Sequence, residues 1–139
     1  MKKTLTLFGL LLMCLLTFAQ NPCPQVIPAL QQWKGAKGTL ALPAQGSIVI
    51  NPQDEATLGQ TASILADDLK ELMGWEYSIT TGKAKKNDIY LSLSQADEQL
   101  GKEGYVLAIN NKVSIEAPTT QGVFWGTRTL LQMLYRQEA

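Results

Sequence analysis

The sequence contains no histidine and only two cysteines among its 139 residues. Without an imidazole, the chain cannot form a Ser-His or Cys-His catalytic pair, a histidine metal site or a histidine acid–base group. Its 12 basic and 12 acidic side chains cancel, which argues against nucleic-acid binding, because polyanions require clustered Lys and Arg. A complete (β/α)8 barrel needs at least about 200 residues. The chain is therefore a small carboxylate-based enzyme or one part of a larger protein.

The first 19 residues have the features of a cleavable secretory signal peptide. Lys2 and Lys3 precede an apolar run that reaches Leu16, and a small residue, Ala19, stands at the expected cleavage site. The apolar run is shorter than the ~20 residues that a membrane-spanning helix needs. We expect a secreted or periplasmic protein that is cut after Ala19 and has no membrane span after cleavage.

Removal of residues 1–19 leaves a mature part, 20–139, with ten basic and twelve acidic side chains. This length is enough to bury a single core, and we predict one domain. Cys23 is then the only cysteine, so no internal disulfide is expected. It stands between two prolines with no basic neighbour to favour its thiolate, which is typical of an incidental free thiol rather than a nucleophile.

Hydrophobic periodicity predicts an α+β domain. Alternating or β-branched residues indicate five strands: 47–50, 77–80, 89–93, 105–109 and 113–117. Helical spacing of apolar residues indicates one helix from about Asp54 to its stop signal at Gly74, and a second that Thr119 or Thr120 caps and that extends through Leu134. Short polar turns join most strands, so we expect a mainly antiparallel sheet with two helices packed on one face.

Two Asp-Glu dipeptides are the natural candidates for catalysis in a chain without histidine, because glycosidases use paired carboxylates. Asp54-Glu55 stands at the start of the first predicted helix, where negative charge is favourable without any catalytic role. Asp97-Glu98 lies in a polar connection with nothing apolar nearby to raise a carboxylate pKa. We interpret both pairs as structural.

No other pattern in the sequence supplies a site. Trp33, Trp75 and Trp125 could stack on sugars, but their positions are better explained by packing. Gly122 and Gly126, four residues apart, favour close approach of the second helix to the sheet. The chain has no phosphate-binding loop, serine elbow or metal-ligand cluster. We assign no catalytic, cofactor-binding or metal-binding residue and no cofactor.

The second half of the sequence carries a more specific pattern, in three blocks: Glu103–Ile109, Val113–Ala117 and Gly122–Leu134. Together they resemble the N-terminal domain that precedes the catalytic barrel in bacterial β-N-acetylhexosaminidases of glycoside hydrolase family 20. Val26-Ile27-Pro28 and Asp88–Leu91 resemble earlier parts of the same domain, so the resemblance covers about residues 25–136.

The resemblance implies a non-catalytic accessory domain of a secreted, exo-acting β-N-acetylhexosaminidase that removes terminal N-acetylhexosamine. In that family the catalytic Asp-Glu pair lies in the (β/α)8 barrel, and neither pair of this chain has a matching context. The barrel is the expected partner and glycans a further one. Because the sequence stops at Ala139, before a barrel could begin, we expect a bare docking surface with modest stability or self-association.

Three alternatives remain at this point. Similar N-terminal domains precede the barrels of O-GlcNAcase and hyaluronoglucosaminidase-type glycosidases. A free-standing carbohydrate-binding module would use Trp33, Trp75 or Trp125 to stack sugars. A periplasmic interaction protein would have no connection with sugars.

Overall fold

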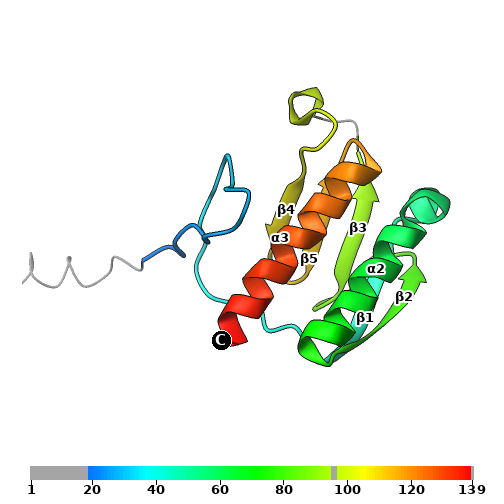
Figure 1. Cartoon of the computed structure of the whole chain (residues 1–139), viewed down its shortest axis with the longest axis horizontal. Helices are drawn as coiled ribbons and strands as arrows, with labels where there is room; N and C mark the ends of the chain where they lie inside the picture. Colours follow the sequence, from blue (N-terminus) through cyan, green and yellow to red (C-terminus); the bar gives the residue numbers. More distant parts are fainter. Residues whose placement is uncertain (1–18, 95–96, 139) are drawn as a thin grey trace, which may run out of the picture.

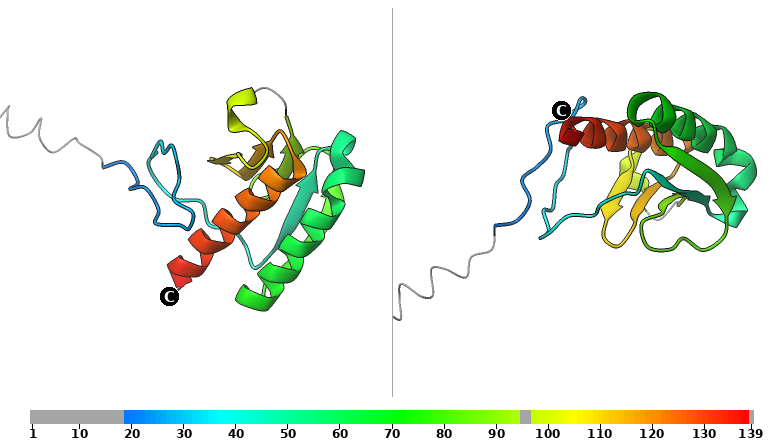
Figure 2. Two further views of the ribbon diagram at one scale, coloured as in Figure 1. Left: turned by 45° about the horizontal axis from the view of Figure 1, so that its top comes forward. Right: turned by 90° about the horizontal axis from the view of Figure 1, so that it is seen from below.

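The computed structural model describes residues 19–94 and 97–138. A five-stranded sheet carries two long helices on one face (Figures 1 and 2). The elements follow in the order β1 (Gln45–Ile50), η1 (Pro52–Asp54), α2 (Glu55–Met73), β2 (Glu76–Thr81), β3 (Ile89–Leu93), η2 (Glu98–Leu100), β4 (Val106–Ile109), β5 (Val113–Ala117) and α3 (Thr120–Glu138). The α+β class and the placement of both helices on one face are confirmed.

The predicted antiparallel sheet is wrong. The strand order is β2-β1-β3-β5-β4, and β1–β2, β1–β3 and β3–β5 are parallel neighbours. The β4–β5 hairpin, with Asn110 and Asn111 at its turn, is the antiparallel pair that the sequence predicts correctly. The sheet is therefore mostly parallel, with one antiparallel strand at its edge.

A stagger between strands explains why a short connection joins β2 to β3 in parallel. Ile48 of β1 pairs with Ile79 near the end of β2 and with Ile89 at the start of β3. The start of β3 therefore lies level with Ile79, close to where β2 ends. Residues 82–88 have only to cross β1 and need not run back along the whole length of β2. Gly82 and Asn87, with φ of 128° and 67°, turn the chain there. The polar turn that suggested a hairpin is thus a crossover.

The helix boundaries follow the signals in the sequence. Gly74 ends α2 in a left-handed conformation, with φ of 69°, and its N–H donates to Lys70 O at 3.0 Å. Thr119 caps α3, because its hydroxyl oxygen accepts the N–H of Gly122 at 3.0 Å. No helix within the described residues is long and apolar enough to cross a membrane.

The core lies between the sheet and the two helices. Its largest fully buried side chains come from three central strands and from both helices: Ile48, Ile50, Leu58, Leu65, Leu69, Ile89, Leu91, Val113, Ile115, Val123 and Leu130. Leu72, which the sequence places on the apolar stripe of α2, remains half exposed near the helix end. Within residues 19–94 and 97–138, no helix covers the opposite face of the sheet (Figure 2).

Helix α3 approaches the sheet closely at its two glycines, as the sequence predicts. A methyl group on Gly122 would overlap Gly104 O and lie 2.7 Å from the Ala117 methyl carbon. One on Gly126 would overlap a methyl carbon of Ile115. Contacts this short do not occur between real side chains, so both positions require glycine.

The predicted signal peptide lies, apart from Ala19, outside the described residues. Its cleavage and the export of the protein stay predictions.

Candidate functional site

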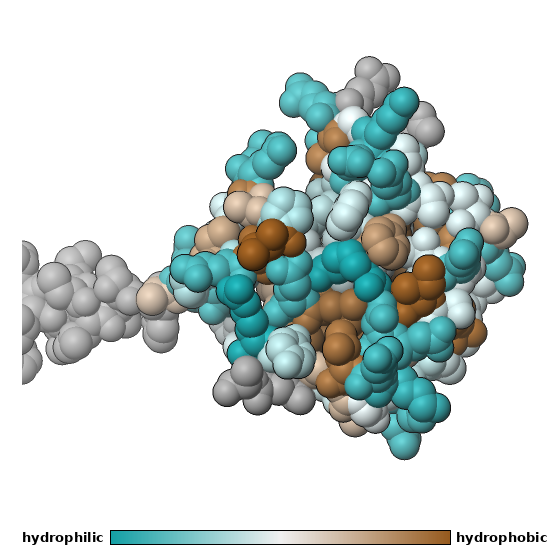
Figure 3. Space-filling model, in the orientation of Figure 1, coloured by the Kyte–Doolittle hydropathy of each residue, from teal (hydrophilic) through white to brown (hydrophobic). Residues whose placement is uncertain are grey.

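The surface that the two helices turn away from the sheet carries exposed apolar side chains. We call this surface the outer helix face and define it by five exposed side chains: Ile27, Ile64, Leu72, Trp125 and Tyr135. Figure 3 views the molecule from this side and shows apolar side chains interleaved with polar ones across it. Ile27 and Tyr135 are the most exposed, at 78% and 58%. These exposed apolar side chains make the outer helix face a candidate interaction surface.

An interhelical ion pair lies in the middle of the outer helix face. Arg128 of α3 reaches Asp68 of α2, with 2.6 Å between Nη1 and Oδ2, and both side chains are about a quarter exposed. The guanidinium also lies over the Phe124 ring, 4.7 Å from its centroid. The Nη2 atom of Arg128 is buried with no hydrogen-bond partner among the described residues.

The amino-terminal segment is fixed to this face by one glutamine. The side chain of Gln132 accepts the N–H of Ile27 at 2.9 Å and donates to Ile27 O at 2.8 Å. The preceding residue, Val26, is buried. The backbone of Ile27 is therefore held at two points while its side chain stays in solvent, so an ordered apolar group is presented outward.

The sequence alone assigned no separate role to Asp68, Arg128 or Gln132, although Arg128 and Gln132 lie within the Gly122–Leu134 block of the family resemblance. Asp68 and Arg128 are sixty positions apart, and each looks like an ordinary surface charge on an amphipathic helix. One available signal was the position of Arg128 four residues after Phe124, which places both on one side of α3.

The aspartate of each carboxylate pair makes a structural contact, whereas the side chain of Glu98 lies outside the described part of the structure. Asp54 accepts the N–H of Leu93 at 2.9 Å, which joins the start of α2 to the end of β3. Asp54 stands at the N-cap position of α2 without a side-chain capping hydrogen bond, so this bond adds to the favourable charge that the sequence predicts at the helix start. Glu55 lies exposed in the first turn of α2. Asp97 accepts the N–H of Gln99 at 3.0 Å and so caps η2. The aspartates thus serve the backbone.

The three tryptophans come from separate elements and make different contacts. Trp33 is 39% exposed and donates from its indole nitrogen to Asn21 O at 3.1 Å. Trp75 is half-buried and stacks on Tyr77 with 6.2 Å between ring centroids. Trp125 packs edge-on against Phe124 at 5.6 Å. Their contacts fit the packing interpretation, and none of them lines either hollow described below.

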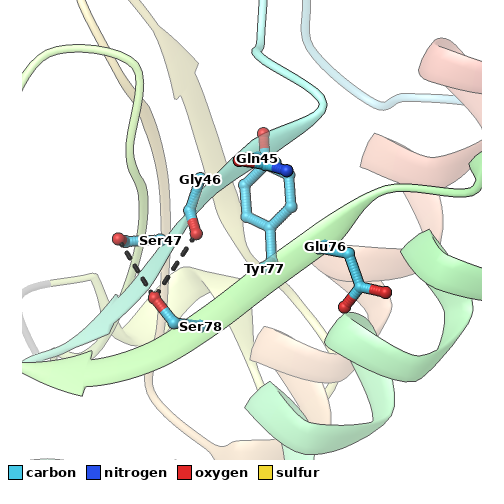
Figure 4. Close-up of a pocket in the computed structure, with 6 residues that line it drawn as sticks. All are labelled: Gln45, Gly46, Ser47, Glu76, Tyr77 and Ser78. Carbon is cyan, nitrogen blue, oxygen red and sulfur yellow. Dashed lines mark hydrogen bonds between the residues drawn. The ribbon is translucent and has the colours of Figure 1, made fainter.

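A surface hollow of about 500 Å³ lies where β1 and β2 begin (Figure 4). The Tyr77 hydroxyl donates to Pro43 O at 2.8 Å, and burial, helped by the negative charge of Asp88, raises the pKa of Tyr77 to about 12. The carboxylate in the hollow, Glu76, is paired with Lys70 at 3.1 Å. These groups are already satisfied by local partners.

The uncovered face of the sheet carries a tyrosine among acidic groups. Burial raises the pKa of Tyr90, and the charges of Asp54 and Glu116 act in the same direction. Glu116 also accepts from the Ser92 hydroxyl at 3.4 Å. In the part of the chain that the structure describes, no three Cys, Asp or Glu residues gather as a metal site would require.

Comparison with known proteins places these features in a family. The family described as glycosyl hydrolase family 20, domain 2, matches residues 23–139. The chain belongs to this family. A lacto-N-biosidase from Bifidobacterium bifidum is 32% identical to the family 20 domain over 113 residues, which are 80% of this chain and 10% of that protein.

Solved structures of two carbohydrate-active enzymes share the fold of the family 20 domain. A GH20 beta-N-acetylhexosaminidase from Streptomyces coelicolor A3(2) matches with a TM-score of 0.60 and 24% identity, over 83% of this chain and 22% of that one. A GH138 enzyme targeting pectin rhamnogalacturonan II matches with a TM-score of 0.54 and 21% identity, over 68% and 10% of the two chains. The family 20 domain thus spans a quarter or less of each relative.

Proposed function

We propose that this family 20 domain is the non-catalytic accessory domain of a secreted, exo-acting β-N-acetylhexosaminidase that hydrolyses terminal N-acetylhexosamine residues. The observation that carries the proposal is the family match over residues 23–139, in a chain whose two candidate aspartates, Asp54 and Asp97, accept backbone N–H groups. The apolar leader that starts with Lys2 and Lys3 supports export to the periplasm or the medium.

The catalytic domain of the same enzyme is the partner for the outer helix face. The lacto-N-biosidase and the GH20 hexosaminidase are both far longer than this domain, which covers 10% and 22% of them. Covering Ile27, Trp125 and Tyr135 would remove apolar area from water, which favours association by about 25 cal/mol per Å².

The role in this arrangement is mechanical. The domain supplies a rigid layer of two helices braced by a sheet, and the catalytic groups belong to the partner. The Asp68–Arg128 pair and the Gln132 clamp on Ile27 hold the outer helix face in one shape before docking, so little ordering entropy is lost on contact.

The proposal is tested by an assay with an aryl β-N-acetylglucosaminide. The purified chain should give no hydrolysis above the buffer rate, whereas a product of the same locus that includes a catalytic domain should hydrolyse it. Hydrolysis by the chain alone that is lost in the variant Glu98→Gln would contradict the accessory role.

The carbohydrate-binding alternative has one observation in its favour, the exposure of Trp33 and Trp125 at 39% and 38%. It predicts a change in tryptophan fluorescence when chitooligosaccharides are added, and a smaller change in Trp33→Phe or Trp125→Phe. The accessory role predicts an unchanged spectrum at millimolar sugar.

A further inference from the structure

Strand β2 forms one edge of the sheet, and no strand of the described residues pairs with its outer side. Figures 1 and 2 show it at the margin of the molecule. Proteins normally protect such an edge with lysine, proline or a bulge, because unpaired backbone groups recruit another strand. Residues 77–81, with the sequence YSITT, contain no charge and no proline.

The unpaired groups of β2 are arranged symmetrically about one residue. Glu76 N donates to Ala44 O and Gly82 N to Ile50 O, so the even-numbered residues face β1. Backbone groups alternate along a strand, which leaves the N–H and C=O of Tyr77, Ile79 and Thr81 pointing outward. A second copy in antiparallel orientation would pair Ile79 with itself and Tyr77 with Thr81. All three outward donors and acceptors of each copy then meet a partner.

Helix α2 leaves room beside this edge. A hollow of about 330 Å³ is lined by six residues of α2, β1 and β2: Ile50, Glu55, Gly59, Ile79, Thr80 and Thr81. A methyl group on Gly59 would meet nothing within 4 Å, so packing within the described chain does not require glycine there, although glycine weakens a helix. Ile79 is 41% exposed at this hollow.

Charge favours a second copy as the occupant. Glu76 stands at the start of β2 and Lys83 just beyond its end. Antiparallel pairing about Ile79 brings the start of each strand next to the end of the other, so Lys83 of one copy comes near Glu76 of the other on both sides of the symmetry axis. The pairing of Glu76 with Lys70 does not prevent this, because the Glu76 side chain remains 64% exposed. Such a self-complementary patch is what a two-fold dimer requires.

We propose that the outer edge of β2 is a homodimerisation site, at which two copies pair antiparallel about Ile79 and form one continuous sheet. The Ile79 side chains meet at the axis on the helix side of the sheet, and the space above Gly59 accommodates the partner's isoleucine. This contact is separate from the outer helix face, which stays free for a catalytic domain.

The first test is sedimentation velocity over a hundredfold range of concentration, on protein purified as the expressing cell processes it. The wild-type chain should show a reversible monomer–dimer equilibrium. Ile79→Lys places two ammonium groups at the axis and should raise the dimer dissociation constant at least about tenfold. Val106→Lys is the matched control, because Val106 is a similarly exposed residue on the opposite edge strand, β4, and it should leave the constant unchanged.

The second test separates association from folding. Gly59→Leu fills the hollow with a good helix former, so it should raise the thermal midpoint while weakening the dimer. Amide exchange of the wild-type protein should slow at Ile79 and Thr81 as concentration rises. A wild-type chain that stays monomeric throughout would overturn the proposal. So would a dimer that Ile79→Lys leaves intact, or one that is lost in Val106→Lys or Trp125→Asp instead.

Discussion

Helix α3 lies so close to the sheet that Gly122 and Gly126 have no space for a methyl group, whereas Gly59 of α2 faces open space. The same residue type thus has two physical explanations in one domain. On the α3 side, glycine is required by contacts within the chain. On the α2 side, no contact within the described chain requires glycine at position 59, and the proposed second copy would explain it. A glycine in a helix is informative only after its surroundings are known.

The largest effect should come from adding a methyl group on the α3 side. We expect Gly122→Ala and Gly126→Ala each to lower the free energy of unfolding by about 1–3 kcal/mol, since overpacking forces the backbone or a core side chain to move. Urea unfolding followed by circular dichroism measures this. Unchanged urea midpoints in both variants would contradict the close approach of α3 to the sheet.

The contact between the two helices should have the next largest effect. Arg128→Met leaves Asp68 without its partner at a site only about a quarter exposed, and we expect a loss of about 1–2 kcal/mol.

The double variant Asp68→Leu with Arg128→Met should recover most of that loss, because an apolar pair replaces the ion pair. If the double variant is as unstable as the sum of Asp68→Leu and Arg128→Met, the two side chains do not interact.

Adding a methyl group to the glycine of α2 should change the free energy of unfolding in the opposite direction. Gly59→Ala removes the helix penalty of glycine and meets no neighbour, so we expect a gain of up to about 1 kcal/mol. The unfolding midpoint in urea of Gly59→Ala, measured beside Gly126→Ala, gives the comparison directly. A loss of stability in Gly59→Ala would show that the space above α2 is already filled.

The smallest expected effect is the pH dependence of folding stability that Tyr77 of β2 contributes. Burial raises the pKa of Tyr77 to about 12, above the ordinary value of 10, so the unfolded chain loses the phenol proton at lower pH than the folded chain does. The contribution of Tyr77 to stability is complete below pH 10 and declines as pH rises toward 12. Tyr90 acts in the same direction.

Thermal midpoints from pH 9 to 12 test the role of Tyr77. They should fall less steeply with pH in Tyr77→Phe than in the wild-type chain. Equal slopes of midpoint against pH would contradict the contribution of the Tyr77 phenol.

Residues that act on their immediate neighbours in the sequence predicted much of this fold, whereas the pairing of distant strands was not predicted. Gly74, Thr119 and the Asn110-Asn111 turn act on their immediate neighbours, so their effects can be inferred from the sequence. The pairing of β3 depends on where it meets Ile48 of β1, some forty residues earlier, and the short polar connection therefore indicated the wrong direction.

The outer helix face shows the same limit. Leu72 and Trp125 could be placed on the two predicted helices, yet the pairing of Asp68 with Arg128 and the clamp of Gln132 on Ile27 join segments sixty and 105 positions apart. Only the packed structure brings these residues together. The sequence resemblance, in contrast, led directly to the family, because its blocks lie within contiguous strands and one helix.

The most direct test of the accessory role is hydroxyl-radical footprinting of the domain alone and within a longer enzyme from the same locus. The account predicts that labelling of Trp125 and Tyr135 falls strongly when the catalytic domain is present, while labelling of Val106, far from the outer helix face on β4, does not change. Equal labelling of Trp125 and Tyr135 in the two proteins would contradict the central claim that the catalytic domain covers the outer helix face.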